Sequence, residues 1–297
     1  MSDKDVLLEV TSDHLNTGMR GVPVGTCRTS FVTPSEGVHY CGYPITELAA
    51  FAPEDIIYLL FNKELPTSEQ SAQIRSELAQ RATIPGDLES VLHALPTTGH
   101  PMDWLSVGIH ALGMIGTTND WRSDAMNLIA RMPRLMGLVF RIREGRTENI
   151  PADDPDASLV DRFVNTLDLD GIDKKKMTRV ISTYLVLHMD HGGGNLSTFT
   201  GKAIASGHAT IYSAMAGAMN ALSGPLHGRA NQSCLEFVLR VGTSDAAKVE
   251  AFVRAELAAK RPVFGFGHAV LRTEDPRATA QFALGEEICP EDENFKI

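Results

Sequence analysis

Apolar residues recur at every third or fourth position over most of the chain, which is the pattern of amphipathic helices. Pro53 followed by two acidic residues opens one such stretch, and Thr67 with Gln70 forms a capping box at the start of the next. Asp275 followed by a proline marks the start of the last one. The spacing predicts helices that begin near these residues and others at about 88–95, 105–112, 125–140, 173–191, 197–207, 209–222 and 249–257.

A few stretches depart from the helical pattern. Residues 30–33 and 38–41 flank a Pro-Ser-Glu-Gly sequence, which predicts a short β-hairpin with a four-residue turn. Pro133 lies inside the stretch 125–140, and we expect it to break or kink that helix because it lacks a backbone donor. Residues 146–157 contain prolines and acids and are predicted to form a loop. Without repeats or βαβ alternation, the predicted fold class is all-α with a small N-terminal β element.

Composition and charge narrow the functional classes. The chain has 297 residues, of which 43% are apolar and 22% charged, and this is enough for a substantial core. Its 27 Lys and Arg against 37 Asp and Glu give a net charge of −10, which argues against a partner such as nucleic acid or an anionic membrane surface. Residues 203–228 carry no charged side chain, but polar residues interrupt them, so we interpret them as a buried helix rather than a membrane span.

Two histidines stand at the end of the predicted helix 173–191. The apolar face of this helix reaches Tyr184, and steps of four and three residues continue it to His188 and His191, just before three glycines. One interpretation is a hydrogen-bonded pair of core histidines, and a second is a metal site built on the His-x-Asp-His pattern. A third is the floor of a polar pocket, whose glycines let a ligand approach the backbone.

Two further segments contain residues that suit an anionic ligand. His227 lies in a Gly/Pro turn ahead of a predicted helix, whose dipole favours a neutral imidazole that can donate a hydrogen bond; the alternative is a capping histidine. His268 follows two glycines in Gly-Phe-Gly-His. Arg277 falls in the first turn of the last helix, which is the unfavourable end of the dipole for a cation. It either faces an anionic ligand or is an exposed arginine.

Taken together, these segments resemble the citrate synthase family. The matching pieces occur in family order and span nearly the whole chain: Gly18-Met-Arg-Gly21, residues 35–44, residues 188–197, residues 219–232 and residues 265–277. The residues of these motifs are most similar to those of the mitochondrial-type branch of the family. The resemblance implies a large helical domain over residues 1–226, a partial small domain over residues 227–297 and a homodimer. It also implies a transferase of the tricarboxylic acid cycle that condenses acetyl-CoA with oxaloacetate, with Si-type stereochemistry.

The resemblance assigns roles by motif. His227 would stabilise the enol of acetyl-CoA, and His268 would polarise and then protonate the oxaloacetate carbonyl. The implied oxaloacetate pocket consists of His188, His191, Asn195 and Arg277. The implied contacts to CoA come from Arg20, Arg272, Val263, Gly265 and Gly267. It implies no metal and no permanently bound cofactor, since acetyl-CoA is a co-substrate.

The base that removes a proton from acetyl-CoA is an aspartate in the family, in an Asn-Val-Asp segment that this sequence does not contain. We expect a fragment whose remainder is a separate C-terminal segment; the alternatives are a homologue that binds both ligands without turnover, or a different base. The runner-up activity is 2-methylcitrate synthesis from propionyl-CoA. The expected compartment is the bacterial cytoplasm or, for a processed eukaryotic protein, the mitochondrial matrix.

Overall fold

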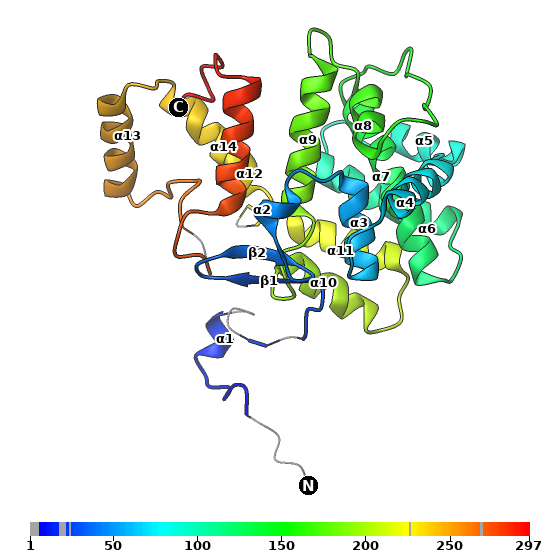
Figure 1. The fold of residues 1–297 in the computed structure, drawn as a ribbon, viewed down its shortest axis with the longest axis horizontal. Coiled ribbons are helices and arrows are strands. Elements are labelled where there is room, and N and C mark those ends of the chain that lie inside the picture. The colour runs from blue at the N-terminus through cyan, green and yellow to red at the C-terminus, as the bar shows by residue number, and fades with distance from the viewer. Residues whose placement is uncertain (1–5, 18–21, 24, 226, 268–269) are drawn as a thin grey trace.

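The computed structural model describes residues 6–17, 22–23, 25–225, 227–267 and 270–297. Figure 1 shows mostly helical layers with one small sheet at the centre of the view. The strands are β1 (Ser30–Thr33), β2 (Gly37–Tyr40) and β3 (Tyr43–Pro44). The helices are α1 (His14–Thr17), α2 (Ile45–Leu48), α3 (Pro53–Asn62), α4 (Ser68–Arg81), α5 (Gly86–His93), α6 (Pro101–Ile115), α7 (Trp121–Arg143), α8 (Leu159–Leu167), α9 (Lys174–His188), α10 (Leu196–Ala205), α11 (Ile211–Leu222), α12 (Ala230–Val241), α13 (Ala246–Ala258) and α14 (Pro276–Ile288).

The predicted helix starts are confirmed where a capping residue marks them. Thr67 accepts a hydrogen bond from the backbone of Gln70, and the Gln70 side chain accepts one from the backbone of Thr67, so both halves of the capping box form. Asp275 caps α14 by accepting from the backbone N–H of Arg277, with Pro276 at the first helical position. Local hydrogen bonding alone fixes these ends, which is why the sequence reveals them.

The predicted hairpin is present and gains a third strand. β1 and β2 pair antiparallel with Ser30 opposite Tyr40, and β3 adds a short antiparallel pairing in which His39 lies opposite Pro44. Val38 and Tyr40 are fully buried in a core that includes the end of α9. The sheet therefore packs directly against the helix end that carries His188.

The structure corrects two expectations about helices. α7 runs from Trp121 to Arg143 without a break at Pro133, because the buried residues Leu128 and Leu135 on both sides pack into one core that supports the helix. α9 ends at His188 and not at residue 191. Beyond it the chain leaves the helix, and Gly192 adopts a positive φ of 86° that L residues rarely take.

The face of α9 that is buried also differs from the predicted one. Val186 and Leu187 are its buried residues, whereas Tyr184 and His188 lie on a side that is partly open to solvent. The interpretation of His188 as a core histidine is therefore wrong, because the sheet packs against the neighbouring face of the helix.

The uncharged stretch 203–228 forms the end of α10 and α11, which pack closely against each other. A Cβ atom added at Gly217 of α11 would lie 2.1 Å from a terminal carbon of Ile204, so a larger residue there would have to displace that side chain. Tyr212 packs over Gly113 of α6 in the same way. The interpretation as a buried helix is confirmed for Ala214, Ala216 and Ala218. No helix in the described part of the chain is both long and apolar enough to cross a membrane.

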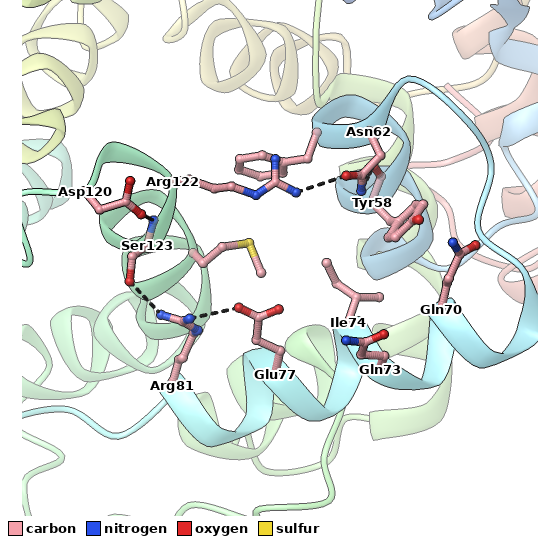
Figure 2. Close-up of a pocket in the computed structure, with 12 residues that line it drawn as sticks. Tyr58, Asn62, Gln70, Gln73, Ile74, Glu77, Arg81, Asp120, Arg122 and Ser123 are labelled. Atoms are coloured by element: carbon pink, nitrogen blue, oxygen red, sulfur yellow. Dashed lines mark hydrogen bonds and ion pairs between the residues drawn. The ribbon is translucent and has the colours of Figure 1, made fainter.

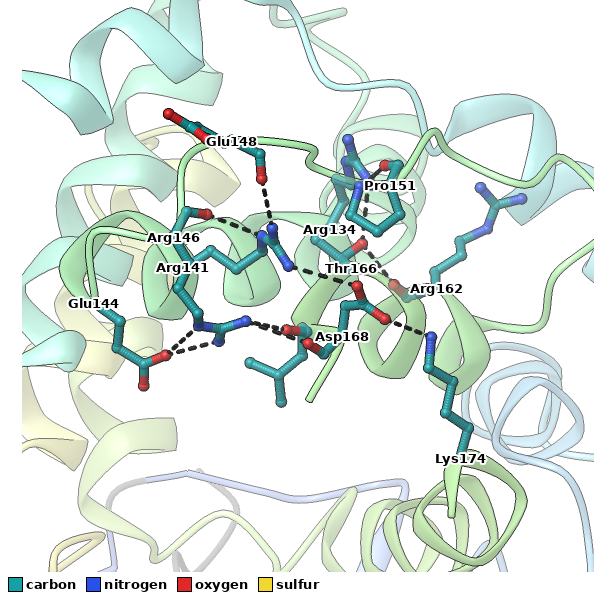
Figure 3. Close-up of polar contacts among 11 residues, drawn as sticks. Arg134, Arg141, Glu144, Arg146, Glu148, Pro151, Arg162, Thr166, Asp168 and Lys174 are labelled. Atoms are coloured by element: carbon teal, nitrogen blue, oxygen red, sulfur yellow. Dashed lines mark hydrogen bonds and ion pairs between the residues drawn. The ribbon is translucent and has the colours of Figure 1, made fainter. Parts of the chain in front are cut away.

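The predicted loop at residues 146–157 is confirmed, and buried arginines hold it (Figure 3). Arg141 donates to the backbone carbonyls of Arg146 and Glu148, at 3.1 and 3.0 Å. Arg162, only 3% exposed, donates to Asp153 at 2.5 Å and to the carbonyl of Pro155 at 3.0 Å. Charge-assisted hydrogen bonds of this kind stabilise a loop that has few apolar residues of its own.

The C-terminal helices α12 to α14 lie on one side of the molecule, and α14 runs beside α9 (Figure 1). The start of α14 is fixed to the hairpin, since the backbone N–H of Arg272 donates to the carbonyl of Pro34 at 3.0 Å. Pro276 packs against Gly37 of the same turn. The division into domains at residues 226 and 227 stays a prediction.

Candidate functional site

The candidate site lies where α9 ends and the chain turns into α10. Asp190, two residues beyond the helix, accepts a hydrogen bond from the hydroxyl of Thr29 at 2.5 Å and one from the backbone of Gly192 at 3.0 Å. Its own N–H donates to the hydroxyl of Tyr40 at 3.2 Å. Burial raises the pKa of Tyr40 to about 12, so this phenol stays neutral. These bonds hold the loop that contains His191 against the sheet.

Asn195 serves as the N-cap of α10. Its side-chain oxygen accepts from the backbone N–H groups of Ser197 and Thr198, at 2.9 and 3.3 Å. The hydroxyl of Ser197 in turn lies 2.8 Å from Nε2 of His227. The first turn of α10 therefore connects the cap residue Asn195 to His227, which lies 30 residues beyond Ser197.

His227 is held by a tight turn. Its backbone N–H donates to the carbonyl of Gly224 at 3.0 Å, and the N–H of Gly228 donates to the carbonyl of Leu222. A Cβ atom at Gly228 would lie 2.5 Å from that same carbonyl oxygen, so the turn requires glycine. Burial lowers the pKa of His227, which favours the neutral imidazole at physiological pH. A neutral ring anchored at Nε2 can present Nδ1 to a carbonyl oxygen of a ligand.

His188 is oriented by the residue one turn before it. Its Nδ1 donates to the backbone carbonyl of Tyr184 at 2.7 Å, and the two rings stack with centroids 4.2 Å apart. Because the carbonyl can only accept, the proton lies on Nδ1, and Nε2 is the nitrogen left for a ligand. Desolvation of the ring lowers the pKa of His188, and the positive charge of Arg277 lowers it further.

Arg277 lies in the first turn of α14 with its side chain only 11% exposed, so the interpretation as an exposed arginine is wrong. Its guanidinium makes a two-pronged ion pair with Asp275, at 3.0 Å to Oδ1 and 2.6 Å to Oδ2. Its charge acts on Tyr40, Tyr184 and His188, because α14 packs beside α9. A cation in this position suits a carboxylate ligand bound next to His188.

The residues expected to contact CoA include the stretch from Val263 to Arg272, which precedes α14. Arg272 donates from its side chain to the carbonyl of Leu271 at 3.0 Å. Gly265 and Gly267 have positive φ values of 88° and 83°, which make the loop after Val263 turn sharply. Two of the expected site residues, Arg20 and His268, lie outside the residues that the structure describes.

The sequence matches the family described as citrate synthase, C-terminal domain, over residues 18–297. The chain belongs to the citrate synthase family. Its fold is that of solved citrate synthases: the enzyme from Thermotoga maritima is 28% identical with a TM-score of 0.83, and the match covers 95% of this chain and 75% of that one. The enzyme from Pyrobaculum aerophilum is 27% identical with a TM-score of 0.80, over 91% of this chain and 70% of that one.

A third solved citrate synthase shows the same fold. The enzyme from Thermoplasma acidophilum is 24% identical with a TM-score of 0.84, and the match covers 97% of this chain and 77% of that one. That structure is a ternary complex with carboxymethyl coenzyme A and oxaloacetate.

Sequence reasoning missed two residues that hold the candidate site together. Ser197 was quoted only as part of a motif, and Tyr184 was interpreted as an apolar face residue. Both make their decisive contacts to residues on other elements, Ser197 to His227 and Tyr184 to Asn231. No local pattern distinguishes such a residue from an ordinary helical serine or tyrosine.

Two cavities lie away from this site. One of about 310 Å³ is enclosed by α3, α4 and the start of α7 and is lined by Tyr58, Arg81 and Arg122 among others (Figure 2). The other, of about 780 Å³, lies between the start of α3, α4 and residues 155–162. Neither is lined by a residue that the sequence assigned to substrate. Within the described parts of the chain, no group of three or more His, Cys, Asp or Glu side chains is arranged to hold a metal ion.

Proposed function

We propose that this chain condenses acetyl-CoA with oxaloacetate and water to give citrate and free CoA, as a Si-type citrate synthase of the tricarboxylic acid cycle. The main observation behind the proposal is that His227 has a lowered pKa and is hydrogen-bonded to Ser197, in the turn of α10 that Asn195 caps. Membership of the citrate synthase family supports it. The activity is an acyl transfer in which the acyl group becomes an alkyl group of the product.

The thioester is activated first. A carboxylate base removes a proton from the methyl group of acetyl-CoA, and negative charge develops on the thioester oxygen. His227 donates a hydrogen bond to that oxygen from its neutral ring, which stabilises the enol without requiring a charged imidazole. The lowered pKa of His227 suits this role because a neutral donor matches the weakly acidic enol.

The enol carbon then attacks the keto carbon of oxaloacetate, and a new carbon–carbon bond forms. The keto oxygen takes a proton, a role that the resemblance gives to His268. Water hydrolyses the resulting thioester, and CoA leaves as the free thiol. Four residues are proposed to bind the dianionic oxaloacetate, with Arg277 supplying the positive charge: His188, His191, Asn195 and Arg277. The CoA moiety is proposed to lie against Arg20, Arg272, Val263, Gly265 and Gly267.

The ternary complex of the Thermoplasma acidophilum enzyme supports this pair of substrates for the fold. Acetyl-CoA is then a co-substrate and not a bound cofactor. A homodimer is proposed on the family resemblance.

The test is release of CoA thiol by the purified chain, measured with acetyl-CoA and with propionyl-CoA at matched concentrations of oxaloacetate. The proposal predicts oxaloacetate-dependent thiol release that is faster with acetyl-CoA. Faster turnover of propionyl-CoA would identify a 2-methylcitrate synthase instead. A folded chain that binds oxaloacetate calorimetrically but releases no thiol would be a binding homologue or would need the carboxylate base of a separate C-terminal segment, and the proposal that this chain alone catalyses the condensation would be wrong.

A further inference from the structure

Tyr184 contacts both His188 and the beginning of α12. Its hydroxyl accepts a hydrogen bond from the side-chain amide of Asn231 at 2.7 Å. Its ring stacks on His188 with an interplanar angle of 23°, and its backbone carbonyl accepts the Nδ1 proton of His188. Asn231 lies four residues beyond His227. Tyr184 therefore connects His188 to the helix that follows His227.

We propose that Tyr184 is a positioning residue, which couples the docking of α12 on α9 to the orientation of His188 and so to the binding of the keto-dicarboxylate substrate. The inference rests on the proposed function for the identity of that substrate. It assigns to Tyr184 a role that follows from its three contacts.

The Asn231–Tyr184 bond is the polar contact between the first turn of α12 and α9 among the described residues. Phe237 is the buried residue of α12, whereas Leu235 and Leu239 are 56% and 53% exposed. This bond therefore helps to set where the first turn of α12 lies relative to His188, whereas the turn of His227 is also held by its backbone bonds and by Ser197.

The hydroxyl of Tyr184 is suited to accept this bond. Burial raises the pKa of Tyr184, so the phenol is neutral and retains its own proton. Because Asn231 donates, the plane of the Tyr184 ring is fixed at one end by α12. The stacked face then fixes the plane of His188, and Nε2 is the ring nitrogen left for a ligand.

Two substitutions separate the contacts of Tyr184. Tyr184→Phe keeps the ring against His188 and removes the hydrogen bond, and Asn231→Ala removes the same bond from the other side. A net hydrogen bond corresponds to about 2- to 13-fold in an equilibrium constant. We expect the KM for oxaloacetate to rise by a factor in this range in each variant, with a smaller change in kcat.

The double variant gives the sharper readout. Because both substitutions remove one bond, Tyr184→Phe combined with Asn231→Ala should raise the KM no further than either alone. Amide hydrogen exchange over residues 230–241, measured without substrate, should be faster in all three variants. Tyr58→Phe, which removes a tyrosine hydroxyl in the cavity of Figure 2, is the matched control and should leave both quantities unchanged.

The outcomes distinguish this inference from the proposed function. A wild-type chain without turnover overturns the proposed function. An active wild type whose variants fold, as shown by thermal melting, but leave the oxaloacetate KM and the exchange of residues 230–241 unchanged overturns the role of Tyr184. Multiplied effects in the double variant would also overturn it, because they would mean that Tyr184 and Asn231 act separately.

Discussion

Ser197 offers the sharpest test of how His227 works. Ser197→Ala removes the hydroxyl that lies 2.8 Å from Nε2 of His227 and leaves the backbone N–H that Asn195 caps. Without this partner the imidazole loses its fixed plane and tautomer. One net hydrogen bond is worth about 0.5–1.5 kcal/mol, so we expect kcat to fall about 2- to 13-fold. The KM for oxaloacetate should stay constant, because Ser197 acts on the histidine assigned to the thioester.

The assay is thiol release at saturating oxaloacetate with acetyl-CoA varied. Ser206→Ala is a matched control, since its hydroxyl bonds only to the carbonyl of Ala203 at the far end of α10. His227→Ala sets the lower limit of activity. The reasoning is refuted if Ser197→Ala retains the full wild-type kcat while His227→Ala is inactive. In that case His227 acts without the orientation that Ser197 provides.

Three further results are expected. Because the pKa values of His188 and His227 are lowered in the folded protein, the unfolded chain binds more protons than the folded chain below about pH 6.5. In denaturant titrations the free energy of unfolding should therefore be constant above that pH and fall below it. A rise on acidification would contradict the lowered pKa values of the two histidines. Arg277→Ala removes a charge-assisted contact of about 1.5–3 kcal/mol, so calorimetry should show oxaloacetate affinity reduced about 13- to 160-fold, and unchanged affinity would place Arg277 outside the pocket. Arg162→Met removes charge-assisted hydrogen bonds to Asp153 and Pro155 and should lower the free energy of unfolding by about 1.5–3 kcal/mol in denaturant titrations, whereas a loss under 1 kcal/mol would show that the loop at 146–157 does not depend on it.

Local chemistry explains which parts of the fold could be predicted. The capping box at Thr67 and the cap at Asp275 involve residues within a few positions of each other, so the sequence specifies them. Pro133 was expected to break or kink a helix, and the break is absent because the core on both sides of the proline supports the helix. The end of α9 was misplaced because Asp190, which directs the chain away, is held by Thr29 from 161 positions earlier.

The residues of the candidate site also divide into those that local sequence marks and those whose contacts are distant in sequence. His227 could be found because glycines and a proline surround it, and Arg277 because a cation at a helix N-terminus is unusual. Ser197 and Tyr184 could not, because their contacts join elements that are far apart in sequence. The roles assigned to His191 and the CoA-binding loop stay predictions that only ligand-bound measurements can test.

The most direct test of the central claim is detection of citrate itself. Purified chain is mixed with oxaloacetate and acetyl-CoA that is ¹³C-labelled at the methyl carbon, and the products are followed by NMR. The account predicts labelled citrate that appears only when oxaloacetate is present and is lost in His227→Ala. A folded wild-type chain that leaves the label in acetyl-CoA, or forms equal citrate with and without His227, would contradict it.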